Sequence, residues 1–171
     1  ECSDIALLFA TRAQAEQAVV ALHGLGYALR ELHLAGDLVC FESEAQNLVA
    51  SADKNKTGSD VFCHDFRTAE TFVVNRYQEP PTRLPLCGGR IIRANGLASP
   101  PSVAREGERA RVCYESPATN LVKGDLNKAS DVFLLDRCSC DMILLSRRND
   151  GSQLTTASGS CDVAAGGSLA A

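Results

Sequence analysis

Two polar segments of the sequence carry oxygen-bearing side chains at spacings that suit a hard metal ion. These side chains are Asp125, Asn127 and Asp131 in one segment and Asp53, Asn55 and Asp60 in the other. Carboxylate and amide oxygens along a loop are ligands that Ca²⁺ prefers, so these residues are the candidate calcium ligands. The full D-x-[DN]-x-[DN]-G pattern is missing. We therefore favour the alternative, an Asx-rich turn in which the same side chains bond the backbone.

The eight cysteines are the other residues with distinctive chemistry. An even number permits four disulfides in an oxidising compartment, and the spacings do not match a zinc site. Cys40 and Cys113 lie between apolar neighbours, and we expect both to be buried free thiols rather than paired ones. The sequence contains no G-x-S-x-G, P-loop or H-E-x-x-H pattern, so no catalytic or cofactor-binding residue is assigned.

The composition is that of a folded globular protein. The chain has 171 residues, of which 45% are hydrophobic and 22% are charged. Its formal net charge of -4 argues against nucleic acid as the main partner, because phosphate binding needs a basic face. Apolar runs are much shorter than the roughly 18 residues of a membrane helix. We expect no transmembrane segment, and no signal peptide is visible.

The elements that position these residues occur twice. The stretch CFESEAQNLV begins at Cys40, and the similar stretch CYESPATNLV begins at Cys113. In each copy the motif SDVF follows. Short apolar or β-branched runs predict the strands, which are Val39 to Glu42 and Val61 to His64 in the first copy, and Arg111 to Glu115 and Val132 to Leu135 in the second. We therefore expect one antiparallel sheet per copy.

The C-terminal stretch repeats once more. ASGSCDVAAGGSLAA from Ala157 parallels ASPPSVAREGERARV from Ala98, so that Val163 matches Val103 and Gly167 matches Gly107. A third copy therefore begins in this stretch.

The motif order in PSVAREGERARVCYESPATNLVKGDLNKASDVFLLDR resembles the WD40-like PD40 repeat of TolB-type β-propellers. The resemblance covers about residues 36–171. It implies a mainly β fold of four-stranded antiparallel blades, with copies at about 36–97 and 98–156 and a partial copy at 157–171. It also implies a periplasmic or extracellular location. The family usually has glycine in the hairpin where this chain has Ala69 and Cys140, so we expect a different turn there.

Residues 1–35 do not repeat and predict a short α/β segment of strand, helix and strand. An apolar stripe at helical spacing predicts the helix and consists of Ala15, Ala18, Val19 and Leu22. This stretch is similar to the last half of an RNA-recognition motif, and that alternative implies RNA binding. The aromatic stacking pair of such domains is not evident, so we favour an amphipathic helix packed on a sheet.

Other charged residues are expected to have structural roles. Asp65 and Asp136 end predicted strands, where they are expected to cap turns. The hairpin around Gly107 alternates basic and acidic side chains, which predicts a solvated face. These side chains are Arg105, Glu106, Glu108, Arg109 and Arg111.

The leading functional expectation is a non-catalytic protein-binding or structural module that forms a subunit or fragment of a larger assembly. Two blades and the start of a third are fewer than the four to eight that close a propeller. We expect the open strand edges to bury a surface against another protein subunit or the rest of a longer chain, near Val163 and near Val73 or Leu144. The alternative is a propeller-type hydrolase or lyase whose site is completed by missing blades.

Overall fold

A computed structural model describes residues 33–44, 48–49, 58–78, 91–164 and 169–170, together with Ala13. The predicted N-terminal strand and helix lie outside these residues, as do Asp53 and Asn55. The described part is mainly β, as predicted, and its sheets are antiparallel. Within the described ranges, no helix is long and apolar enough to span a membrane.

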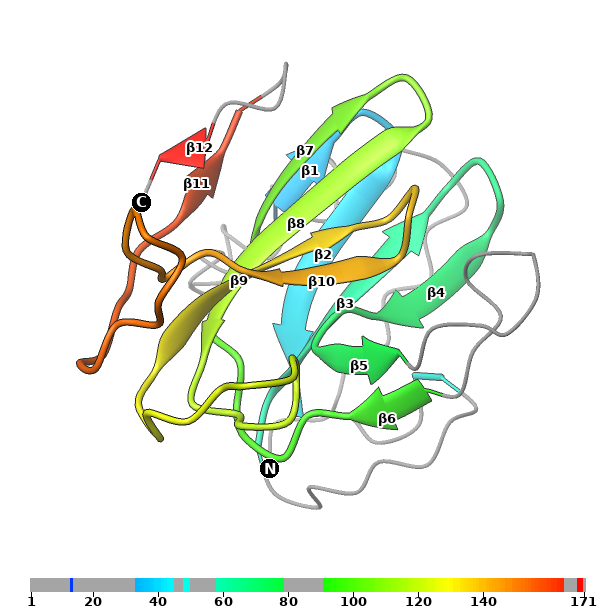
Figure 1. Cartoon of the computed structure of the whole chain (residues 1–171). Coiled ribbons are helices and arrows are strands. Elements are labelled where there is room, and N and C mark those ends of the chain that lie inside the picture. Colours follow the sequence, from blue (N-terminus) through cyan, green and yellow to red (C-terminus); the bar gives the residue numbers. More distant parts are fainter. Residues whose placement is uncertain are drawn as a thin grey trace, which may run out of the picture.

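Two four-stranded sheets form the body of the structure (Figure 1). Sheet one has the order β1-β2-β3-β4, and its strands are His33–Ala35, Leu38–Ser43, Asp60–Asp65 and Glu70–Val73. Sheet two has the order β7-β8-β9-β10, and its strands are Ser102–Glu106, Arg109–Ser116, Asp131–Asp136 and Asp141–Leu144. Each SDVF motif runs into a central strand, which confirms the predicted strand pairing in both copies.

Sheet one also includes a strand that precedes the repeat boundary expected at residue 36. β1 pairs with β2, with Leu34 opposite Val39. Gly36 turns the chain between these strands with φ 61°, and Gly107 does the same between β7 and β8 with φ 58°. Glycine adopts this left-handed conformation without the steric cost that a β-carbon brings. The two glycines therefore form matching turns in the two sheets.

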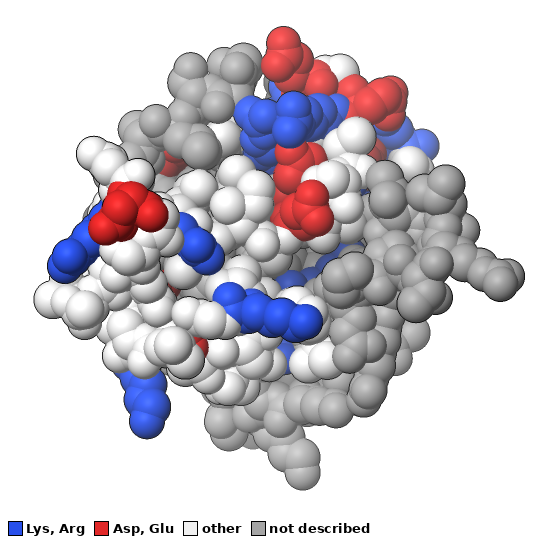
Figure 2. All heavy atoms as spheres, in the orientation of Figure 1, with Lys and Arg blue, Asp and Glu red and all other residues white. Residues whose placement is uncertain are grey.

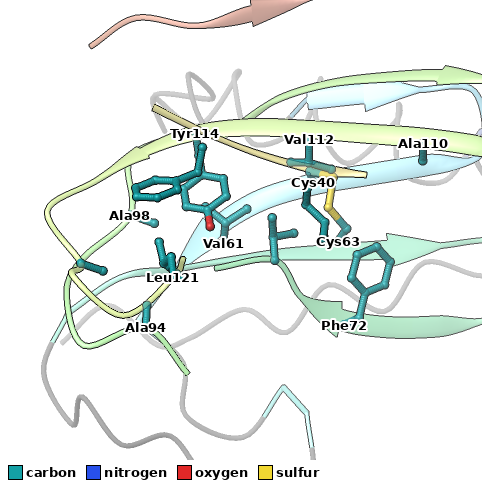
Figure 3. Packing of buried hydrophobic residues seen from close by; sticks show 14 of the residues in the cluster. Cys40, Val61, Cys63, Phe72, Ala94, Ala98, Ala110, Val112, Tyr114 and Leu121 are labelled. Atoms are coloured by element: carbon teal, nitrogen blue, oxygen red, sulfur yellow. A yellow bond between two sulfur atoms is a disulfide. The ribbon is translucent and has the colours of Figure 1, made fainter. Parts of the chain in front are cut away.

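The core lies between the facing sides of the two sheets (Figure 3). Val112 and Tyr114 of β8 point toward Cys40, Val61 and Cys63 of sheet one, and all five side chains are buried. Residues two apart along a strand share a face, so the alternating apolar positions of β8 supply this layer.

Corresponding aromatic residues pair across the central strands of both sheets. Phe41 lies opposite Phe62 with ring centroids 6.1 Å apart. Tyr114 lies opposite Phe133 at 6.0 Å. Cross-strand aromatic pairs of this kind add to sheet stability.

Two smaller sheets, each with two strands, complete the described part of the fold. One pairs β5 with β6, which are Arg76–Gln78 and Ile91–Arg93, and the other pairs β11 with β12, which are Asp162–Val163 and Leu169–Ala170. β11 lies beside β7 and β8, and β1 lies on the other side of β7 (Figure 1).

The three side chains expected near a partner interface are buried within the chain. Val163 packs against Ala104, Cys113 and Leu134. It is 4% exposed, and Val73 and Leu144 are also buried. The chain itself covers these three side chains, and a partner surface near them stays a prediction.

The expectation of free thiols at Cys40 and Cys113 is also wrong. Cys40 bonds Cys63, which lies directly opposite on β3 with a Cα–Cα distance of 4.1 Å. Cys113 bonds Cys161, with a Cα–Cα distance of 6.3 Å. In the second copy Leu134 faces Cys113 across the sheet, so the sulfur of Cys113 pairs outside its own sheet.

The hairpins at Ala69 and Cys140 keep a left-handed residue despite the missing glycine. The φ angles are 54° at Ala69 and 60° at Cys140, so the expectation of a different turn is wrong. The strand pairing on either side determines the turn, because β3 and β4 stay paired up to the last pair, in which Asp65 lies opposite Glu70. A residue with a β-carbon pays about 1 kcal/mol for this conformation.

Replacing Ala69 with glycine is therefore expected to raise the free energy of unfolding by about 0.5–1 kcal/mol. Urea denaturation of the wild type and the variant measures the difference. Ala157→Gly is the matched control, since Ala157 is exposed and is not among the residues with positive φ. It is expected to lose stability through added freedom of the unfolded chain. Equal losses in both variants would contradict the prediction.

Candidate functional site

A buried carboxylate begins the central strand of sheet one. Asp60 is 3% exposed and accepts hydrogen bonds from Asn75 Nδ2 at 2.6 Å and Arg93 Nη1 at 3.1 Å. Asn75 Oδ1 in turn accepts the backbone N–H of Val61 at 2.9 Å. Buried charges need such partners because desolvation otherwise disfavours them. The cluster ties the start of β3 to the end of β4 and to β6.

Sheet two has a matching cluster in which an amide replaces the arginine. Asp131 accepts hydrogen bonds from Ser146 Oγ at 2.5 Å and Gln153 Nε2 at 3.1 Å. Ser146 Oγ accepts the backbone N–H of Val132 at 3.2 Å, as Asn75 does for Val61. The position of Arg93 is therefore taken here by a neutral side chain.

Asp125 joins the second cluster. Its Oδ1 accepts a hydrogen bond from the same Gln153 Nε2 at 2.8 Å. Its Oδ2 is buried and has no hydrogen-bond partner among the described residues. Two carboxylates thus share one neutral donor.

The other two described members of the predicted calcium set, Asn127 and Asp60, lie elsewhere. Asn127 Oδ1 accepts the backbone N–H of Ala129 at 2.9 Å, and its Nδ2 donates to the Leu154 carbonyl at 2.8 Å. This is the geometry of an Asx turn. Asp60 belongs to the separate cluster of sheet one, where it faces Arg93. Among the described members of the predicted set, the structure therefore brings together only Asp125 and Asp131. Among the described residues, no group of three or more His, Cys, Asp or Glu side chains is placed to hold a metal ion.

Calcium binding at Asp125 and Asp131 stays a prediction, and melting curves test it. If Ca²⁺ binds this pair, a chelator is expected to lower the melting temperature, because a ligand bound only by the folded state stabilises it. Asp125→Asn is expected to remove that response, and Asp150→Asn, at an exposed loop position, to keep it. A wild-type curve that chelator leaves unchanged supports the Asx-turn interpretation.

The opposite ends of the central strands carry the predicted turn caps. Asp65 Oδ1 accepts the backbone N–H of Arg67, and Asp136 Oδ1 accepts that of Cys138, both at 3.0 Å. This confirms the capping role expected for both carboxylates.

The arginines of the β7–β8 hairpin form ion pairs that the sequence interpretation missed. Arg105 Nη1 lies 3.0 Å from Asp65 across the two sheets, and its side chain is only 8% exposed. Arg109 Nη2 lies 2.5 Å from Asp136. The prediction of a merely solvated face is therefore wrong for Arg105. Two further ion pairs link the sheets near these hairpins, Arg67 with Glu108 and Arg137 with Glu70. Figure 2 shows basic and acidic side chains intermingled toward the top of the view, where the β7–β8 hairpin lies.

These ion pairs change the acidity of the capping carboxylates. Burial acts to raise the pKa of Asp136, but hydrogen bonds from Arg109 and from the Cys138 backbone outweigh it and lower the pKa below its ordinary value of 3.8. The pKa of Asp65 is lowered in the same way, against burial, by Arg67 and Arg105. Both groups therefore favour the ionised form in the folded chain.

A carboxylate whose pKa is lower in the folded than in the unfolded chain stabilises the fold at pH values above its unfolded-state pKa. This stability is lost as the pH falls through the folded-state pKa. The free energy of unfolding is therefore expected to fall as the pH drops below about 4. Arg109→Gln is expected to make this fall shallower, measured as urea midpoints at pH 6 and pH 3. Arg148→Gln, at an exposed residue, is the control. The same pH dependence in both variants would show that Arg109 does not hold the Asp136 carboxylate in its ionised form.

Comparison with models of protein families, with curated proteins and with solved structures finds no match to this chain.

Proposed function

We propose that the chain is a non-catalytic protein-binding or structural module built from two TolB-type propeller blades and the start of a third. The observation that carries this proposal is the direction in which the sheets stack. Propeller blades repeat by rotation around an axis, so one face of each blade packs on the opposite face of the next blade.

The described sheets meet in this head-to-tail way. The Tyr114 and Phe133 side of sheet two packs on the side of sheet one that carries Cys40 and Cys63. The other side of sheet two, with Cys113, packs against Val163. Cys40 and Cys113 occupy matching positions in the two copies, so the corresponding face of each sheet contacts the next sheet along the chain. A two-sheet sandwich related by a twofold axis would instead bring the same faces together.

The order of the first strands supports the same arrangement. β1 lies beside β7, and β7 lies beside β11. These are the first strands of the three successive copies, since Val163 of β11 matches Val103 of β7. In a propeller the innermost strands of successive blades are neighbours around the central axis.

The proposed binding surface is the edge of sheet two at β10. Within the described residues β10 has a hydrogen-bonded strand neighbour on one side only, which is β9. It also exposes Ile143, which is 43% accessible. An open strand with an exposed apolar side chain can pair with another polypeptide. We propose that a second copy or another protein subunit pairs along β10.

Light scattering on the purified chain tests this proposal. We expect a species larger than the monomer, and we expect Ile143→Lys to shift it to the monomer, because a charge on an edge strand opposes pairing. Leu126→Lys is the matched control, since Leu126 is 82% exposed but lies outside the strands. A folded, non-aggregating wild-type monomer would overturn pairing between copies along β10 while leaving the blade arrangement intact.

We also propose an oxidising location, either periplasmic or extracellular. Two disulfides in the described residues support it, because such bonds persist mainly in oxidising compartments.

A further inference from the structure

Arg76 is a buried guanidinium that the rest of the described structure leaves uncompensated. It begins β5 and is 7% exposed. Its backbone N–H donates to the Val74 carbonyl at 2.8 Å. Its Nε is buried without a hydrogen-bond partner, and among the described residues no ion pair or side-chain hydrogen bond of Arg76 is found.

The surroundings of Arg76 are themselves positively charged. Arg93 lies directly opposite on β6, and like charges at opposed positions of an antiparallel pair are unfavourable. Burial lowers the pKa of Arg76, and the positive charges of Arg137 and Arg93 lower it further, while Glu70 acts in the other direction.

Two described carboxylates of this region, Asp60 and Glu70, are engaged by the other arginines. Arg93 Nη1 lies 3.1 Å from Asp60. Arg137 Nη2 lies 2.6 Å from Glu70, and its guanidinium stacks over Phe72 at 4.2 Å. Among the described residues, Arg93 and Arg137 each pair with one of these carboxylates, and Arg76 pairs with neither.

The second copy shows that the fold does not require a buried guanidinium here. Arg147 of the second copy corresponds to Arg76. Its backbone forms an antiparallel bridge with Gln153, at the place where Arg76 lies opposite Arg93 in the first copy. Arg147 is exposed, and its Nη1 donates to the Gly151 carbonyl at 3.3 Å. The same backbone position thus places its charge in solvent in one copy and in the interior in the other. A buried charge without a partner is costly, so a counter-ion would stabilise the first copy alone.

We propose that Arg76 anchors a binding site for a phosphate-type oxyanion, with Arg137 as the second cationic group. The planar guanidinium matches two oxygens of such an anion at once. The side chain of Arg137 is 24% exposed, so this side of the site is open to solvent. The ligand class is a free phosphate or the phosphate group of a larger molecule. The site does not depend on the proposed partner surface at β10.

Thermal melting in inorganic phosphate tests the site, with sodium chloride at the same ionic strength as the reference. At about ten times the dissociation constant, phosphate is expected to raise the wild-type melting temperature by about 3–6 °C relative to the chloride reference. Arg76→Gln is expected to abolish this difference. Arg147→Gln is expected to retain it, and that control also accounts for the general stabilisation by phosphate through exclusion from the protein surface.

Arg76→Lys provides the second test, because lysine keeps the charge but not the two-pronged geometry. It is expected to keep less than half of the phosphate shift in melting temperature, and circular dichroism checks that each variant is folded.

If both Arg76 variants fail to fold, titration of the wild type and of Arg137→Gln with phosphate tests the site instead. Weaker phosphate binding is expected in Arg137→Gln. A wild-type shift no larger than in chloride, or an undiminished shift in Arg76→Gln, would overturn the proposal. Phosphate esters that shift the melting temperature more than phosphate itself would identify the larger ligand as the source.

Discussion

Replacing Asp60 with alanine is expected to lower the free energy of unfolding by about 3–5 kcal/mol. The substitution removes the carboxylate to which Asn75 and Arg93 donate inside the protein. The guanidinium of Arg93 is only 3% exposed, so water does not replace the lost acceptor. Urea denaturation followed by circular dichroism measures the change.

Asp131→Ala provides the comparison that separates charge from hydrogen bonding. Asp131 is as deeply buried, but its partners Ser146 and Gln153 are neutral. The loss expected there is smaller, about 1–3 kcal/mol. Asp150→Ala, at an exposed turn, is expected to cost less than about 1 kcal/mol. Equal losses at Asp60 and Asp131 would show that the charge of Arg93 contributes little.

Removal of the disulfide between Cys113 and Cys161 is expected to cost about 4 kcal/mol. The bond closes a loop with a sequence separation of 48, so it strongly restricts the unfolded chain. The bond between Cys40 and Cys63 closes a separation of 23 and is expected to contribute about 3.5 kcal/mol. Double alanine variants at each pair, compared by urea denaturation, measure both contributions.

The order of the two losses is the informative result. A larger loss for the shorter loop would mean that contacts in the folded state, rather than chain entropy, dominate the effect of these bonds. Cys138, the free cysteine within the described residues, is exposed, and Cys138→Ala serves as the control that should leave stability nearly unchanged.

The strands were predictable because two independent signals agree on them. Val132 to Leu135 is a short apolar run, and its counterpart Val61 to His64 recurs at the same place after the CFESEAQNLV-type motif. Both runs become central strands, buried on both faces over most of their length. Asp65 and Asp136 were also predictable as caps, since a carboxylate directly after a strand bonds the following turn.

The pairing of polar and sulfur groups was not predictable, because it depends on how the sheets meet. Cys40 and Cys63 become neighbours through the register of β2 and β3. The pair of Arg105 with Asp65 requires knowledge of which hairpins lie together across the sheets. Arg93 donates to the buried Asp60 in the first copy, and Gln153 takes its place beside Asp131 in the second. Both residues come from segments where the two copies differ in length. The repeat did hold one signal that the two copies pair their cysteines differently. Leu134 stands where the first copy has Cys63, so Cys113 has no cysteine opposite it on the neighbouring strand.

The strand order also has a consequence for the sequence of folding events. Within each four-stranded sheet, strands that are consecutive in the chain are neighbours in space, so its contacts are local and its loop-closure cost is low. The docking of β11 depends on distant contacts, such as the hydrogen bond from Ser102 to Asp162 across 60 residues. We expect the two large sheets to form quickly and β11 to dock in a later, slower step. Formation of the disulfide between Cys113 and Cys161 then links the docked C-terminal segment covalently to β8.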